Sequence, residues 1–103
     1  MSLDIQSKIT GDQVYCLQLT GSLDQETYQN FEKTVNNLIK ENIKQLMIDM
    51  QHVDYLSSAG IGALVAAKNI IEKKSANFSI INLQPKVKKV IEVMRLSQLL
   101  NVS

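Results

Sequence analysis

Alternating apolar and polar positions predict two strands at the start of the chain. Residues 3–9 (LDIQSKI) alternate with one break at Ser7, and residues 14–19 (VYCLQL) form a second run of strand length. Gly11 and Asp12 between these runs are typical of a turn. The pattern therefore predicts a β-hairpin.

The hydrophobic period then changes from that of a strand to that of a helix. Asp24 suits an N-cap and Glu26 suits a first helical turn, which predicts a helix of about 16 residues. Residues 45–50 (QLMIDM) follow as a short apolar strand, and a strand–helix–strand unit usually closes parallel and right-handed. The apolar positions that carry the helical spacing are Tyr28, Phe31, Val35 and Leu38.

A second helix is expected from the serines near residue 58 to about Lys74, followed by a strand at 76–83 (ANFSIINL). Pro85 stands where a third helix favours its first residue. The order β-β-α-β-α-β-α predicts one α/β domain over residues 1–103, with a small mixed sheet and helices packed mainly on one face.

The second helix is apolar around most of its circumference. Its expected sheet-facing residues are Ile61, Leu64, Val65 and Ile71. On its other side lie Ala63, Ala66, Ala67 and Ile70, with few polar residues between them. Such a helix has either two neighbours or a docking surface, and the sequence leaves both interpretations open.

Bulk composition narrows the class of protein. The chain has 103 residues, 45% hydrophobic and 20% charged, with a formal net charge of +1. This balance is typical of a soluble globular domain and gives no basic footprint for nucleic acid. No apolar run is long enough for membrane insertion, and the N-terminus lacks a signal-peptide pattern, so a cytoplasmic location is expected. Cys16 is the single cysteine and is expected in the core or on a sheet face.

The stretch YLSSAGIGALVAA, residues 55–67, carries the candidate chemistry. Ser58 is placed as the N-cap of the second helix, with its oxygen accepting from a backbone N–H. Gly60 and Gly62 are poor helix formers in the first turn, which would leave backbone open to a partner or phosphate. A helix N-terminus favours negative charge, so a phosphate on Ser58 could be accommodated there. The sequence therefore leaves two interpretations of Ser58 open, a simple helix cap and a phosphorylation site.

Three other constellations have structural alternatives. His52 is expected in a loop before the serines, and a Ser–His pair could suggest a hydrolase. The nucleophile elbow of a hydrolase needs Gly at the position of Leu56, so a surface loop residue is the favoured interpretation. Three carboxylates, Asp24, Asp49 and Asp54, could hold a divalent cation, but a cap and a strand end explain the first two. No metal site is therefore predicted.

The last helix and the glycine pair give no further chemistry. Lys86, Lys88 and Lys89 form either a solvated helix face or a contact for an acidic partner. Residues 60–62 (GIG) lack the third glycine of a dinucleotide fingerprint, so no cofactor is predicted.

Three segments together resemble the STAS domain family, and more narrowly the bacterial anti-sigma factor antagonists. They are LMIDMQHVDYLSSAGIGAL, LTGSLD, and NLQPKVKKVIEVMRLSQLL, in the family's order. The sequence departs from the family at Ser57, where many members have Asp, and at Ser22, where Glu is common. The first change makes Ser57 a second possible phosphate acceptor.

The resemblance implies a switch that is not an enzyme. In the family, the serine matching Ser58 is phosphorylated by an anti-sigma factor that is also a serine kinase of the histidine-kinase-like ATPase class. The unphosphorylated protein sequesters this kinase, and a PP2C-type phosphatase restores binding. The hypothesis is therefore an anti-sigma factor antagonist controlled at Ser58. The partner-binding residues it implies are Asp24, Asp49, Ser57, Ala59, Gly60, Ile61, Gly62 and Ala63.

A rival hypothesis is a STAS accessory subunit that docks on the ATPase of an ABC-type lipid transporter through the same helix. Such a subunit needs no phosphorylatable serine as a switch.

Overall fold

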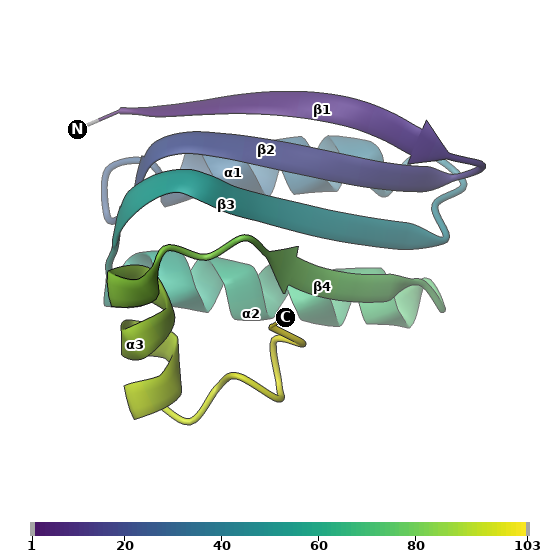
Figure 1. Cartoon of the computed structure of the whole chain (residues 1–103). Coiled ribbons are helices and arrows are strands. Elements are labelled where there is room, and N and C mark those ends of the chain that lie inside the picture. The colour runs from purple at the N-terminus through teal and green to yellow at the C-terminus, as the bar shows by residue number, and fades with distance from the viewer. Residues whose placement is uncertain (1, 103) are drawn as a thin grey trace.

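A four-stranded sheet with two helices behind it forms the body of the computed structural model, which describes residues 2–102 (Figure 1). The predicted order of elements is confirmed, and Pro85 begins the last helix as predicted. The elements are β1 (Leu3–Gly11), β2 (Val14–Leu23), α1 (Tyr28–Leu38), β3 (Gln45–Leu56), α2 (Ser58–Lys73), β4 (Asn77–Ile81) and α3 (Pro85–Val93).

The sheet is mixed, as predicted, with the strand order β1-β2-β3-β4. β1 and β2 form an antiparallel hairpin, whereas β2, β3 and β4 run parallel through the α1 and α2 crossovers. The hairpin turn lies at Asp12 and Gln13 rather than at Gly11 and Asp12, and Gln13 takes a left-handed φ of 63°. Gly11 instead ends β1, opposite Val14.

Two predicted boundaries are wrong. α1 has 11 residues and begins at Tyr28, because a separate turn occupies residues 25–27, so Asp24 is not its N-cap. β3 continues to Leu56, which places His52 in a strand and not in a loop. Two register shifts against β2 break the alternation there, so the polar residues between 51 and 55 look like a loop in the sequence.

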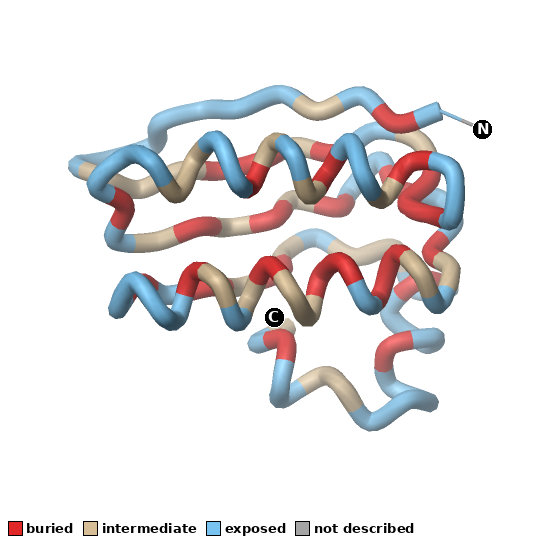
Figure 2. The backbone as a smooth tube through the Cα atoms, turned by 180° about the vertical axis from the view of Figure 1, so that it is seen from behind, coloured by how far each residue is buried: buried red, intermediate tan, exposed pale blue. Residues whose placement is uncertain are grey.

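α1 and α2 lie side by side on one face of the sheet, and each carries buried residues along its length (Figure 2). Phe31 and Val35 of α1 and Ala63 and Ala67 of α2 are buried, whereas Val65 is only half-buried. The predicted inner face of α2 was therefore partly wrong, because α1 covers its alanine side. Of the two interpretations left open, a second neighbour accounts for this side of the helix.

The other large core side chains come from the strands, α2, α3 and the C-terminal segment. Those that are fully buried are Leu17, Leu19, Leu23, Leu46, Ile48, Met50, Leu64, Ile71, Ile80, Ile91 and Leu100.

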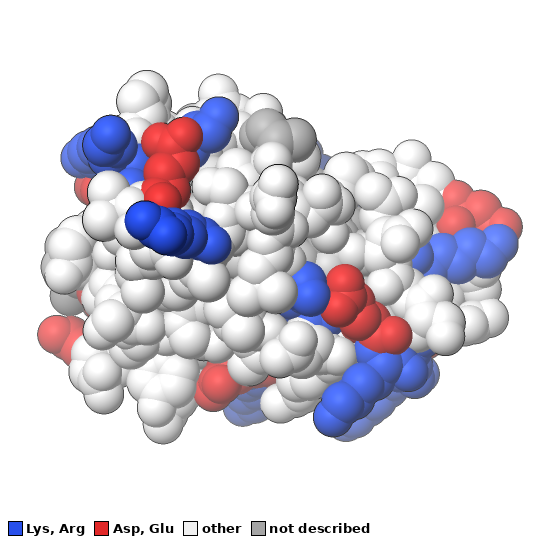
Figure 3. Space-filling view, turned by 90° about the horizontal axis from the view of Figure 1, so that it is seen from below, with Lys and Arg blue, Asp and Glu red and all other residues white. Residues whose placement is uncertain are grey.

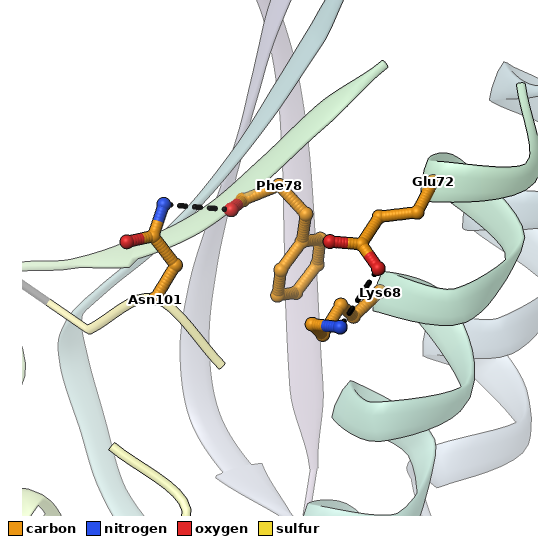
Figure 4. Close-up of polar contacts among 4 residues, drawn as sticks. All are labelled: Lys68, Glu72, Phe78 and Asn101. Carbon is orange, nitrogen blue, oxygen red and sulfur yellow. Dashed lines mark hydrogen bonds and ion pairs between the residues drawn. The ribbon is translucent and has the colours of Figure 1, made fainter. Parts of the chain in front are cut away.

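The C-terminal segment returns to the outer edge of β4. Leu100 is fully buried, and Asn101 donates its side-chain amide to the Phe78 carbonyl at 3.1 Å (Figure 4). The Ile80 amide donates to the Asn101 carbonyl at 3.3 Å, and Val102 forms a parallel bridge to Ile80. This edge of the sheet is therefore covered by the chain itself.

The start of α2 comes into very close contact with the end of β2. A Cβ built on Gly60 would lie 2.3 Å from the Leu23 carbonyl oxygen, whereas one on Gly62 would meet nothing within 4 Å. Gly60 is therefore required by backbone packing, and only Gly62 has the open surroundings expected of both glycines.

Replacing each glycine by alanine separates these two roles. We expect Gly60→Ala to lower the free energy of unfolding by about 2 kcal/mol, because the backbone of α2 must move away from Leu23. Gly62→Ala, the matched control on the same helix, should raise it by about 1 kcal/mol through helix propensity. Urea denaturation measures both, and equal effects of the two substitutions would contradict the packing account.

Candidate functional site

The junction between β3 and α2 is organised by Ser57. Its amide donates to the Leu23 carbonyl at 3.0 Å, its Oγ accepts from the Gly60 amide at 3.2 Å, and its carbonyl accepts from the Ile61 amide. With φ −94° and ψ 173°, Ser57 has the extended backbone of an N-cap. The prediction that Ser58 caps the helix is therefore wrong by one residue, because the bond to Leu23 holds Ser57 outside the helix.

Ser58 is the first residue of α2 and is exposed. Its hydroxyl makes no hydrogen bond to any residue between 2 and 102, since the cap position is taken by its neighbour. The hydroxyl is thus presented to solvent at the positive end of the helix dipole. An anionic group added to this hydroxyl would therefore lie in solvent, and its addition would break no hydrogen bond between described residues.

A hydrogen-bonded turn next to this junction fixes Asp24. Asp24 is buried, and its Oδ1 accepts from the amides of Glu26 at 2.9 Å and Thr27 at 3.2 Å. The hydroxyl of Thr27 donates to the Ser22 carbonyl at 2.8 Å and accepts from the Asp24 amide at 3.0 Å. Leu23, the residue before Asp24, accepts the Ser57 amide, so this turn is joined to the start of α2 through the backbone.

Sequence reasoning missed Thr27. This residue is 7% exposed, and its hydroxyl links both ends of the turn. The available signal was an Asp followed three residues later by Thr, a spacing at which each side chain can bond to the other's backbone.

Asp49 is not close to Ser58. It pairs with Gln18, whereas Leu56 at the end of β3 pairs with Leu23, five residues further along β2. That separation corresponds to about 16 Å of strand, so Asp49, which the resemblance places among the partner-binding residues, lies away from Ser58. Its carboxylate instead accepts from the Gln51 amide at 3.0 Å.

The carboxylates and the histidine do not assemble a metal or catalytic site. Within residues 2–102, no three His, Cys, Asp or Glu side chains gather as metal ligands. Asp54 accepts from the Ser22 hydroxyl at 3.5 Å, and His52 lies exposed on β3. The interpretation of the three aspartates as a cation cluster therefore has no geometric support.

The expected partner-binding residues of α2 divide by burial. Gly62 is exposed, and Ser57 and Ala59 are half-buried, so these three can contribute to a surface around Ser58. In contrast, Gly60, Ile61 and Ala63 are buried, and they can act on a partner only by holding the helix in place.

A hollow lies between the end of β3 and α3, and no pattern in the sequence indicates it. Tyr55, 48% exposed, and Val90 of α3 lie on its rim. Since Tyr55 is three residues from Ser58, the hollow and the serine lie within about 10 Å along the chain. The complete lining is Asp54, Tyr55, Leu56, Lys86, Val87 and Val90.

Charges of both signs are interspersed on the underside of the molecule, which includes α3 (Figure 3). Lys86, Lys88 and Lys89 are all exposed, as a solvated helix face requires. The part of the chain described here contains no helix that is long and apolar enough to cross a membrane.

Cys16 lies buried on the face of the sheet opposite the two large helices, as predicted for a sheet-face residue. Burial raises the pKa of its thiol, and the Asp49 carboxylate raises it further, against an opposing effect of Lys8. The thiolate form is thus disfavoured, and Cys16 is not a nucleophile candidate.

Comparison with known proteins agrees with this geometry. The family model described as the STAS domain matches residues 5–103. The anti-sigma-B factor antagonist of Staphylococcus epidermidis is 23% identical over 103 residues, which are 100% of this chain and 94% of that protein.

Solved structures show the same fold. An anti-sigma factor antagonist from Mycobacterium paratuberculosis superposes with a TM-score of 0.86 at 20% identity, over 98% of this chain and 85% of that one. The antagonist SpoIIAA superposes with a TM-score of 0.82 in its unphosphorylated form, at 15% identity over 97% of this chain and 88% of that one. Its phosphorylated form gives 0.74 at 15% identity, over 97% and 91%. The chain belongs to the STAS domain family.

Proposed function

We propose that this protein is an anti-sigma factor antagonist whose binding to its partner is controlled by phosphorylation of Ser58. The observation that carries the proposal is that the two adjacent serines differ in their contacts and in their exposure. Ser57 holds the helix start through three backbone contacts, and Ser58 holds nothing and is exposed. The names of the relatives, which are antagonists of anti-sigma factors, support the same function.

Electrostatics explains how a phosphate at Ser58 could control binding. A phosphate adds about −1.5 to −2 charges, and at the first residue of a helix the dipole favours that charge, so α2 stays folded. The docking surface around Ser57, Ala59 and Gly62 would then carry a strong negative charge. A partner that fits the neutral surface would be repelled and would have to desolvate the phosphate.

The partner in this proposal is an anti-sigma factor that is also a serine kinase of the histidine-kinase-like ATPase class. A PP2C-type phosphatase would reverse the modification. The chain itself acts as a binding protein in the cytoplasm and not as an enzyme. These assignments follow from the resemblance to the antagonist family.

Single alanine substitutions should separate the structural serine from the modified one. We expect Ser57→Ala to lower the free energy of unfolding by about 1 kcal/mol through loss of the cap, while phosphate is still found on Ser58. Ser58→Ala should leave stability almost unchanged and abolish phosphorylation. The measurements are urea denaturation and mass-spectrometric mapping of the phosphate on protein recovered from its native cells. Phosphate found on Ser57 would contradict this assignment.

Partner capture should depend on charge at residue 58. Wild type, Ser58→Ala and Ser58→Asp baits are incubated with native lysate, and the bound proteins are identified by mass spectrometry. We expect wild type and Ser58→Ala to retain a histidine-kinase-like ATPase, and Ser58→Asp to lose at least about 90% of it, a tenfold loss of affinity. Ser58→Asn, which adds a side chain of the size of aspartate without its charge, serves as the matched control and should retain the ATPase.

Two results would argue against the switch. Equal retention of the kinase by Ser58→Asp and wild type would remove the role of charge at this position. Capture of a transporter ATPase by all baits would instead support the accessory-subunit hypothesis, with Ser57 serving as cap and Ser58 as a plain surface residue.

A further inference from the structure

The two edges of the sheet are treated differently. The edge of β4 is covered by the C-terminal segment through Asn101 and Val102 (Figure 4). β1 forms the opposite edge, and among the described residues no strand pairs with its outer side. In Figure 2, β1 is exposed along most of its length. A free edge strand of this kind is a template for pairing with another strand.

The bonding pattern shows which residues of β1 direct their peptide groups outward. The Ser22 amide donates to the Ser2 carbonyl at 3.0 Å, so even-numbered residues of β1 bond to β2. The peptide groups of the odd-numbered residues therefore face the open edge. At the start of β1, the Asn30 side chain of α1 donates to the Leu3 carbonyl at 3.5 Å, as expected of a carbonyl that does not bond to β2. The outward residues are Leu3, Ile5, Ser7 and Ile9.

The side chains of β1 are complementary to those of a second, antiparallel copy. With Gln6 on a twofold axis, Asp4 of each copy lies opposite Lys8 of the other, in positions without mutual backbone bonds, where side chains lie closest. Neither residue has an ion pair with another residue of the 2–102 range. The opposite charges are thus free to pair between copies.

The same register also satisfies the backbone and the apolar side chains. It bonds Ile5 to Ser7 and Leu3 to Ile9 across the axis, so every bonded position is one whose peptide groups face outward. Ile9 is 70% exposed in the single chain and would face Leu3 of the other copy. Registers centred on Asp4 or on Lys8 would instead place like charges opposite each other.

We propose that the free edge of β1 is a self-association surface, on which β1 of a second copy pairs antiparallel about Gln6 to form a continuous eight-stranded sheet from two four-stranded ones. The surface is separate from the proposed switch, because α2 lies behind β3 and β4, toward the opposite edge (Figure 1). The inference does not depend on the proposed function.

A charge-swap cycle tests the register. Sedimentation equilibrium is measured over a concentration series for wild type, Asp4→Lys, Lys8→Asp and the double variant. We expect wild type to dimerise, each single variant to raise the dissociation constant about tenfold, and the double variant to restore it. Restoration by the double variant cannot arise from a loss of folding.

A proline variant tests the edge itself. Ser7→Pro removes an amide that faces outward while leaving the bonds of β2 intact, so we expect a folded monomer. Circular dichroism and thermal unfolding of every variant establish that the fold is kept. A wild-type protein that stays monomeric at all concentrations would overturn the proposal, and so would a dimer that is insensitive to Ser7→Pro and to the charge swap.

Discussion

The contact between Leu23 at the end of β2 and the start of α2 is the constraint on which the rest of the site depends. One carbonyl oxygen accepts the Ser57 amide and also packs directly against Gly60. Ser57 and Gly60 are the acceptor and the donor of the hydrogen bond that caps α2. Their two contacts with Leu23 therefore fix where the helix begins and how close it lies to the sheet. The exposure of Ser58 and the burial of Ile61 are both consequences of that position.

The same contact ties the candidate site to the core. Leu23 is fully buried, and the turn that follows it begins at Asp24. In this turn the Asp24 carboxylate accepts from the amides of Glu26 and Thr27. The loop after β2, the end of β3 and the first turn of α2 are therefore one hydrogen-bonded unit. This unit lies at the carboxyl ends of parallel strands, where open α/β sheets place their functional residues. A surface built on such a unit is presented in one fixed geometry, which suits recognition of a partner.

The sequence predicted the order of elements, the mixed sheet and Pro85 at the start of α3, because these depend on local hydrophobic period and turn chemistry. It did not predict the length of β3, since bulges against β2 break the alternation that identifies a strand. It also placed the cap on Ser58, because both serines suit a cap locally and only the tertiary bond to Leu23 selects Ser57. The exposed Tyr55 and the hollow beside it likewise depend on α3 packing nearby, which no local pattern reports.

A side chain that supports no part of the fold can be modified without refolding. Under the proposed function, the two states of the protein would share one backbone, and the partner would distinguish them by surface charge alone. The phosphorylated and unphosphorylated states would then interconvert as fast as the modifying enzymes act, with no slow conformational step. The surface charge is also screened by dissolved ions over about 8 Å at physiological ionic strength. The ionic strength of the cell would then determine how strongly a single phosphate repels the partner.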